Sequence, residues 1–254
     1  MRLATFNING RFPGENRVDP DRLATSIRTL APDILALQEV DLDQSRARDA
    51  DLAAIVAEAM ECVDHRFVAA LAGTPGARWV EARDGTPLTG PAFGNALFSR
   101  YPVRNWEVLR MPGAGPHLTL PLPGPRRDAV IGEEPRVALI ADIETPHGLV
   151  RVASTHLSFV PGPNLVQLRR VTRYVEQGKL PALVMGDLNL PGGVPTAITG
   201  YRPLARHRTY PAAHPLVQLD HLLLNGDLAQ VRHTAALHLA VSDHRALLAD
   251  LTND

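Results

Sequence analysis

The chain has 254 residues, of which 45% are hydrophobic and 21% are charged, and its formal net charge is -1. This composition provides enough apolar residues for a sizeable core and excludes an intrinsically disordered chain. A net charge close to zero supplies no global field for a polyanion, so nucleic-acid binding would need a local basic patch. We expect residues 1–254 to form a single domain.

Cys62 is the only cysteine, which rules out an internal disulfide and suits a reducing compartment. The first ten residues, "MRLATFNING", contain Asn7 and Asn9 where a signal peptide would need an unbroken apolar segment. No window approaches the roughly 18 consecutive apolar residues that a membrane helix needs. We therefore expect a cytoplasmic protein with no cleaved signal peptide, no membrane span and no obligate protein partner.

Short apolar or alternating runs, bounded by polar, Gly or Pro residues, predict strands. In chain order the runs are "RLATFNI", "DILALQEV", "GNALFSR", "RVALIADIE", "VRVASTHLS", "ALVMGDLN", "LDHLLL" and "RALLADL". Helical patterns are found at about 20–31, 49–60 and 164–177, and we expect Asn164 to cap the last helix and Gly178 to end it. Several strands with few helices indicate a layered α/β protein.

The segment 111–135 is rich in Pro and Gly and predicts one long irregular loop. Loops of this length are usually functional or mobile. Two interpretations are open: a surface flap without chemistry, or a substrate lip that uses His117, Arg126 and Arg127.

Polar side chains interrupt the apolar runs along the whole chain. Burying an acid, an amide or an imidazole costs several kcal/mol, roughly, unless the group finds a partner or a metal. We therefore expect these side chains to gather in one place. They are Asn7, Glu39, His156, Asp187, Asn189, Asp220, Asp243 and His244.

The residue types in this set favour a particular chemistry. Glu39, Asn7 and Asp187 offer hard oxygen ligands and no thiolate, which suits Mg²⁺ or Mn²⁺ better than zinc. His156 and His244 could bring donors to negative oxygens, and Asp187 could orient or deprotonate an attacking water. The set predicts metal-assisted phosphoester hydrolysis. Each residue taken alone also has a structural explanation, as a cap, a turn residue or a hydrogen-bonded imidazole.

Six short motifs occur in order across almost the full chain: "TFNI", "LQEV", "STHLS", "GDLN", "QLDHLL" and "SDH", with "GNALFSRYPV" between the second and third. This order resembles the endonuclease/exonuclease/phosphatase superfamily, which includes deoxyribonuclease I, AP endonucleases, neutral sphingomyelinases, inositol-polyphosphate 5-phosphatases and deadenylases. The resemblance implies a deoxyribonuclease I-like, four-layer α/β/β/α sandwich of two mostly antiparallel sheets, with the site at one edge.

The resemblance also implies roles for the acids and amides of the set. Glu39 matches the family's metal-binding glutamate, Asn7 its neighbouring asparagine, and Asp243 a second metal contact. Asp187 matches the aspartate that handles the nucleophilic water, and Asn189 the asparagine that holds the phosphate. The predicted cofactor is Mg²⁺ or Mn²⁺.

The histidines follow in the same way. His244 matches the essential imidazole, which Asp220 orients and keeps protonated. His156 matches the histidine that contacts the phosphate. Because of this histidine, the chain resembles deoxyribonuclease I, sphingomyelinases and tyrosyl-DNA phosphodiesterases more than the other branches of the superfamily. His221 stands where many relatives have tyrosine, and we expect it to point to the opposite face from Asp220 and to pack.

Three further residues remain open at this point. Arg136 resembles a family arginine and is either a phosphate-side donor or an edge-strand arginine. Asn95 either fixes a loop beside the site or is a turn residue after Gly94. We expect Tyr210 to pack and not to react.

The leading hypothesis is a metal-dependent phosphodiesterase that acts on an unresolved phosphoester, either nucleic acid or a small phosphodiester. A nuclease would need a few local arginines such as Arg126, Arg127, Arg169 and Arg170, because the charge is near zero and only 5% of residues are aromatic. The alternatives are a lipid head-group phosphodiesterase of sphingomyelinase type, for which no amphipathic membrane helix is found, and a noncatalytic binding module on the same scaffold.

Overall fold

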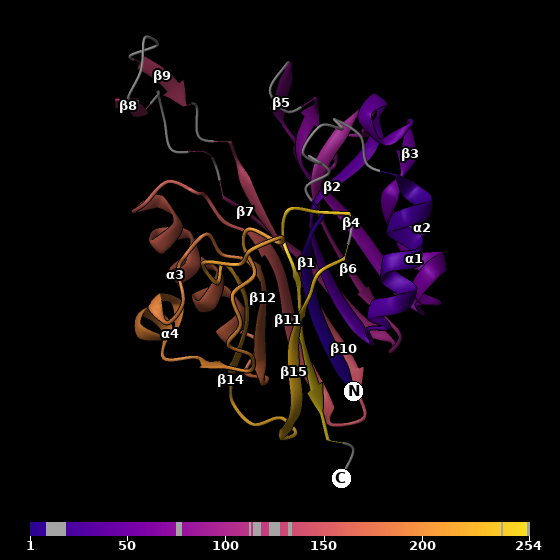
Figure 1. The fold of residues 1–254 in the computed structure, drawn as a ribbon, viewed down its shortest axis with the longest axis vertical. Helices are drawn as coiled ribbons and strands as arrows, with labels where there is room; N and C mark the ends of the chain where they lie inside the picture. Colours follow the sequence, from indigo (N-terminus) through magenta and orange to yellow (C-terminus); the bar gives the residue numbers. More distant parts are fainter. Residues whose placement is uncertain are drawn as a thin grey trace.

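The computed structural model describes residues 1–8, 19–74, 78–111, 113, 118–121, 128–131, 134–239 and 241–252. His117, Arg126 and Arg127 of the predicted substrate lip lie outside the described residues. Two β-sheets pack face to face at the centre of the molecule, and helices cover their outer faces (Figure 1). None of the described helices is long and apolar enough to span a bilayer.

The first sheet has eight strands within the described part of the chain, in the order β15-β16-β1-β2-β6-β4-β5, and β3 pairs with β2. β1 and β2 are parallel, and the other pairs are antiparallel. The strands are β1 (Arg2–Asn7), β2 (Ile34–Gln44), β3 (Ala50–Asp51), β4 (Asp64–Gly73), β5 (Trp79–Glu81), β6 (Ala92–Ser99), β15 (Val231–Leu237) and β16 (Ala246–Leu251).

The second sheet has the order β13-β14-β12-β11-β10-β7. β11 and β12 are parallel, and the remaining pairs are antiparallel. Its strands are β7 (Val103–Met111), β10 (Arg136–Thr145), β11 (Gly148–His156), β12 (Ala182–Asp187), β13 (Arg202–Pro203) and β14 (Asp220–Asn225). Both sheets are therefore mixed and mostly antiparallel, as the resemblance implied.

In the described part of the chain, two helices cover each outer face of the sandwich (Figure 1). The helices α1 (Pro20–Leu30) and α2 (Leu52–Met60) pack on the first sheet, and α3 (Pro163–Glu176) and α4 (Val194–Thr199) pack on the second. A short 3₁₀ helix spans Ser45–Ala47. This arrangement confirms the predicted four-layer α/β/β/α sandwich.

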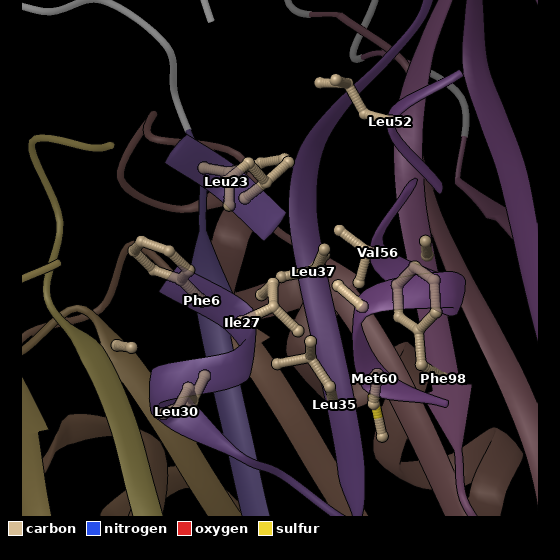
Figure 2. Close-up of a cluster of buried hydrophobic side chains, with 14 of the residues drawn as sticks. Phe6, Leu23, Ile27, Leu30, Leu35, Leu37, Leu52, Val56, Met60 and Phe98 are labelled. Carbon is tan, nitrogen blue, oxygen red and sulfur yellow. The ribbon is translucent and has the colours of Figure 1, made fainter. Parts of the chain in front are cut away.

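Apolar side chains fill the space between each pair of layers. Leu23, Ile27 and Leu30 lie on one face of α1 and pack with Leu35 and Leu37 of β2 (Figure 2). The alternate residues of β2 point into a second cluster between the two sheets, and a third cluster lies between the second sheet and α3. Because β2 is buried on both faces, it reads in the sequence as a nearly continuous apolar run.

Two details of the sequence prediction are wrong. Gly162 caps α3, whereas Asn164 lies inside the helix and accepts the N–H of Gly162 at 3.2 Å. The segment 111–135 is not entirely irregular, because β8 (Leu118–Pro121) and β9 (Asp128–Ile131) form an antiparallel hairpin. An alternating run as short as four residues, bounded by prolines, gives too weak a signal to be distinguished from a loop.

Candidate active site

Three candidate residues end strands at the same edge of the sandwich. Asn7 is the last residue of β1, His156 of β11 and Asp187 of β12. His156 and Asp187 stand side by side in the parallel register, and Asp220, at the start of β14, faces Asp187 from the other side. The register of the second sheet therefore aligns two carboxylates and an imidazole.

The Oδ2 atom of Asp187 lies at the centre of the site. Asn7 Nδ2 donates to it at 3.0 Å, His156 Nε2 lies 3.6 Å from it and His244 Nε2 lies 3.7 Å from it. Burial and the charge of Asp220 raise the pKa of Asp187 to about 7. A carboxyl group with this pKa is a far better base near neutral pH than an exposed aspartate.

A β-bulge directs Glu39 into the same site. The pairing of β2 with β6 passes from Leu37 opposite Ala96 to Val40 opposite Gly94, and Glu39 has a left-handed φ of 59°. Bulges of this kind re-aim a side chain next to an active site. Glu39 therefore lies inside β2, at the bulge, and not at the end of the strand.

Glu39 lies beside the amide of Asn7, whose Nδ2 donates to Glu39 Oε1 at 3.2 Å. Burial raises the pKa of Glu39, and the hydrogen bond from Asn7 opposes this effect. The charge of Asp243, which is half-buried, raises the pKa of Glu39 further. The carboxylates of Glu39 and Asp243 form a negatively charged group that a bound cation would stabilise.

His244 is held as a cation. Its Nδ1 lies 2.9 Å from Asp220 Oδ2, and the ring of Tyr210 packs on it with centroids 4.8 Å apart. Burial lowers the pKa of His244, but the charge of Asp220 and the hydrogen bond to it outweigh burial and raise the pKa to about 10. The packing role that we predicted for Tyr210 is confirmed.

Ser242 is a residue that sequence reasoning missed. Its hydroxyl donates to the carbonyl of Asn7 at 2.6 Å and accepts the backbone N–H of His244 at 3.0 Å. It thereby ties the segment that carries His244 to the end of β1. The only signal in the sequence was a serine two residues before the histidine, which is the spacing of a local serine turn.

His156 is neutral, and its tautomer follows from its neighbour Asn189. The Asn189 Nδ2 group lies 3.0 Å from the Leu157 carbonyl, which only accepts, and 3.2 Å from His156 Nε2. Nε2 is therefore an acceptor, and the ring proton lies on Nδ1. Burial and the positive charges of Arg136 and His244 lower the pKa of His156 well below its usual value. Its short distances to Asp187 and Glu39 are therefore not ion pairs.

Asn189 is held in a left-handed conformation with a φ of 50°. Its N–H donates to Asp187 Oδ1 at 3.0 Å, and its carbonyl accepts from Asn164 Nδ2 of α3 at 3.1 Å. Among non-glycine residues, asparagine is one of the few that adopt this conformation readily, because its short polar side chain can hydrogen-bond locally. Asn164, predicted only as a cap, thus braces the residue that follows Asp187 and Leu188.

The remaining candidates separate into packing and site residues. His221 is buried and its Nε2 lies 2.8 Å from the Leu190 carbonyl, which confirms a packing role. Asn95 is not a loop or turn residue: it lies in β6, opposite the bulge, and donates to the Val137 carbonyl of the other sheet at 2.8 Å. Arg136 opens β10, is buried, and lines a small cavity with His156.

Among the described residues, Asp187, Asp220 and His244 present ligand atoms within 4.8 Å of one another, a spacing that could hold a metal ion. Beside this group, the Glu39 carboxylate accepts from Asn7 Nδ2 and lies near the charge of Asp243. All eight residues of the predicted set belong to this one edge of the sandwich, including Asn189 and Asp220.

The family model described as the endonuclease/exonuclease/phosphatase family matches residues 4–244. Because this match covers most of the chain, the protein belongs to that family and is a phosphoric ester hydrolase. A comparison with curated proteins gave no match.

Several solved structures share the fold. An endonuclease/exonuclease/phosphatase from Beutenbergia cavernae is 22% identical, with 99% of this chain and 71% of that chain covered and a TM-score of 0.64. A mannosyl-6-phosphatase from Bacteroides thetaiotaomicron is 13% identical, with 99% of each chain covered and a TM-score of 0.66. A D. rerio TDP2 humanized by 14 mutations is 15% identical, with 98% and 97% covered and a TM-score of 0.59.

Proposed function

We propose that the protein is a divalent-metal-dependent phosphodiesterase that hydrolyses its substrate by attack of a water molecule on phosphorus. The observation that supports this most is the position of Asp187 Oδ2, which lies within 3.7 Å of Asn7, His156 and His244. A carboxylate for the water, cationic and neutral donors for the phosphate, and oxygens for a cation are then present within one small site.

Glu39, with Asn7 and Asp243, fits a Mg²⁺ or Mn²⁺ ion better than the group of Asp187, Asp220 and His244 does. The carboxylates of Glu39 and Asp243 supply only hard oxygen donors, and burial destabilises the charge of Glu39. His244 is a poor ligand because the charge and hydrogen bond of Asp220 raise its pKa to about 10, and an imidazolium has no lone pair to give. When bound, the cation would polarise a phosphoryl oxygen and neutralise developing charge.

The protein's own groups supply the remaining roles. Asp187 orients and deprotonates the attacking water. His244, as an imidazolium held by Asp220, donates to the phosphoryl oxygens, and His156 donates to them through its Nδ1 proton. Asn189 positions that imidazole, because its amide protons go to the Leu157 carbonyl and to His156 Nε2. The buried guanidinium of Arg136, whose Nε has no hydrogen-bond partner among the described residues, supports a role as a further phosphate-side donor over a purely structural one.

The noncatalytic alternative is less well supported. A binding module on this scaffold has no need for a carboxyl group with a pKa near 7 beside a histidine with a pKa near 10, and such a pair is typical of acid and base chemistry. No feature of the described residues favours a lipid head group as substrate. The phosphomonoester named for the mannosyl-6-phosphatase is the alternative that an assay must separate.

The test is turnover of bis(p-nitrophenyl) phosphate beside p-nitrophenyl phosphate, with added Mg²⁺ or Mn²⁺ and then with chelator. We expect faster release from the diester, loss of activity with chelator, and a Glu39→Gln protein that needs more metal to reach its maximal rate. Asp227→Asn, an exposed change on the loop after β14, is the control and should keep the wild-type metal dependence. Activity that survives chelation, or that is confined to the monoester, would contradict the proposal.

A further inference from the structure

A groove lies outside the catalytic site, between α3 and the edge strand β7. Its volume is about 600 Å³, and Leu109 and Tyr174 contribute apolar surface to it. Arg169, Arg170 and Arg173 of α3 line the same groove. Arg173 is three residues from Arg170 and four from Arg169, so it is a neighbour of each of them on the surface of the helix.

The three arginines are exposed, and none of them forms an ion pair with a carboxylate of the described residues. Glu107 hydrogen-bonds Tyr174 of the groove, but it is already engaged by Arg151 at 2.7 Å. Glu176 lies three residues after Arg173 on α3 and accepts from the Tyr201 hydroxyl at 3.1 Å. The groove therefore presents three positive charges outside any ion pair of the described residues. In a protein of net charge -1 this is the kind of local basic patch that anion binding requires.

The arrangement of the charges indicates a chain of anions. Successive turns of a helix are about 5.4 Å apart, so the backbone positions of Arg169 and Arg173 are spaced along the helix axis. Guanidinium groups bind phosphate oxygens with paired N–H donors. A flat membrane surface would not enter a concave groove, whereas a flexible strand of phosphodiesters would.

The groove is joined to the catalytic site through the start of α3. Asn164, in the first turn, donates to the carbonyl of Asn189 at 3.1 Å. The loop between His156 and α3 carries Phe159, whose side chain is 51% exposed, and Gln167 of α3 accepts the N–H of Ser158 in this loop at 2.8 Å. An exposed aromatic ring on a braced loop is a surface on which a base can stack.

We propose that the α3–β7 groove binds a single strand of nucleic acid through its phosphodiester backbone, and that the strand continues from the groove past Phe159 to the catalytic site. The binding is a property of the groove itself. Its role in selecting the substrate rests on the proposed phosphodiesterase function.

The test compares the binding of a short fluorescein-labelled oligothymidylate by fluorescence anisotropy over a range of salt concentrations. All proteins carry Asp187→Ala, so that the probe is not consumed. One carries in addition Arg169→Gln, Arg170→Gln and Arg173→Gln. The control carries Arg28→Gln, Arg66→Gln and Arg232→Gln, which remove the same charge from exposed positions on α1, β4 and β15.

We expect the groove variant to lose at least about tenfold in affinity at low salt. The magnitude of its slope of log K against log salt should decrease by about 2, because each phosphate contact on a single strand contributes about 0.7 to that magnitude. The control should stay within about twofold of its parent. Equal affinities for the groove variant and its parent would overturn the proposal, and so would equal losses in the groove variant and the control. Binding to phosphatidylglycerol vesicles without binding to the oligothymidylate would also overturn it.

Turnover of bis(p-nitrophenyl) phosphate keeps this proposal separate from the proposed function. With Asp187 intact, the three groove substitutions should leave that turnover unchanged, because the small ester does not reach α3. If the ester is not hydrolysed but strand binding still depends on the three arginines, the phosphodiesterase proposal is wrong and the proposal that the groove binds a single strand is supported. If the ester is hydrolysed and the strand is not bound, the groove proposal fails alone.

Discussion

Two histidines lie at similar distances from Asp187 Oδ2, but one is positively charged and the other is neutral. His244 is a cation because Asp220 accepts its Nδ1 proton at 2.9 Å, whereas His156 is neutral because it is buried near Arg136 and His244. The difference comes from their neighbours and not from their distance to Asp187. One charged and one neutral imidazole therefore lie beside Asp187.

Replacing Asp220 should change how activity depends on pH. In the wild-type protein Asp187 must be ionised and His244 protonated, so kcat/KM should rise through about pH 7 and fall through about pH 10. In Asp220→Asn the partner charge is lost and burial lowers the pKa of His244, so the alkaline fall should begin at lower pH. A bound cation favours ionised Asp187 and moves the acidic rise to lower pH.

The measurement is the pH profile of kcat/KM for bis(p-nitrophenyl) phosphate, with Asp227→Asn as a control that should keep both limbs. An unchanged alkaline limb in Asp220→Asn would show that Asp220 does not act through the charge of His244.

At this scale the sequence predicted which polar residues gather at one edge of the sandwich, but not how each is held. The ordered motifs identified Asn7, Asp187 and His244 because polar residues inside apolar runs must find partners. The bulge at Glu39 had no signal, since its left-handed backbone depends on the pairing of β2 with β6. The brace from Ser242 likewise depends on a contact between residues 235 positions apart.

At the scale of elements, the close approach of β12 to β11 aligns the site. A Cβ atom on Gly186 would lie 1.9 Å from the Thr155 carbonyl oxygen, so only glycine permits this pairing. The next residues of the two strands are His156 and Asp187, which face each other in register. The glycine of "GDLN" therefore lets the two strands approach closely enough to place His156 beside Asp187.

Gly186→Ala should destabilise the protein by roughly 1–3 kcal/mol, as overpacking in a buried site does, because the two strands must separate. Gly193→Ala is the matched control: no atom lies within 4 Å of its Cβ position, and its φ of -82° suits alanine. Guanidinium denaturation should show a lower midpoint for Gly186→Ala alone. Equal midpoints would mean that β12 is free to move away from β11.

The predicted strands were those with buried, continuous patterns, such as β12 and β14. β7, with the sequence "VRNWEVLRM", and β15, with "VRHTAAL", were missed because both are partly exposed and carry charged or polar side chains. Strands of this kind are specified mainly by their neighbours in the sheet and not by their own propensity.

At the scale of the whole molecule, the candidate active site joins the two sheets. Asn7 belongs to the first sheet and Asp187 to the second, and one apolar cluster fills the space between the sheets. The strands near the two ends of the chain, β1 and β16, pair with each other, and the N–H of Leu251 donates to the Met1 carbonyl at 2.8 Å. We propose that residues 1–254 fold as one cooperative unit.

The two tryptophans of the chain report on the two sheets separately. Trp79 lies on β5 of the first sheet and Trp106 on β7 of the second. In the single-tryptophan proteins Trp79→Phe and Trp106→Phe, the fluorescence and far-UV circular dichroism transitions should coincide within each protein. Tryptophan transitions at clearly different denaturant concentrations from the circular dichroism curve would mean that the sheets unfold independently.

The central claim is that Asp187 and His244 act together on one phosphorus centre. The most direct measurement is kcat for bis(p-nitrophenyl) phosphate at saturating metal in Asp187→Asn, His244→Gln and the double variant. We predict losses of about 10²-fold or more for each single variant, and a double variant only slightly slower than the slower single one, because residues that act as a unit are not additive. A wild-type rate in either single variant, or losses that multiply in the double variant, would contradict the claim.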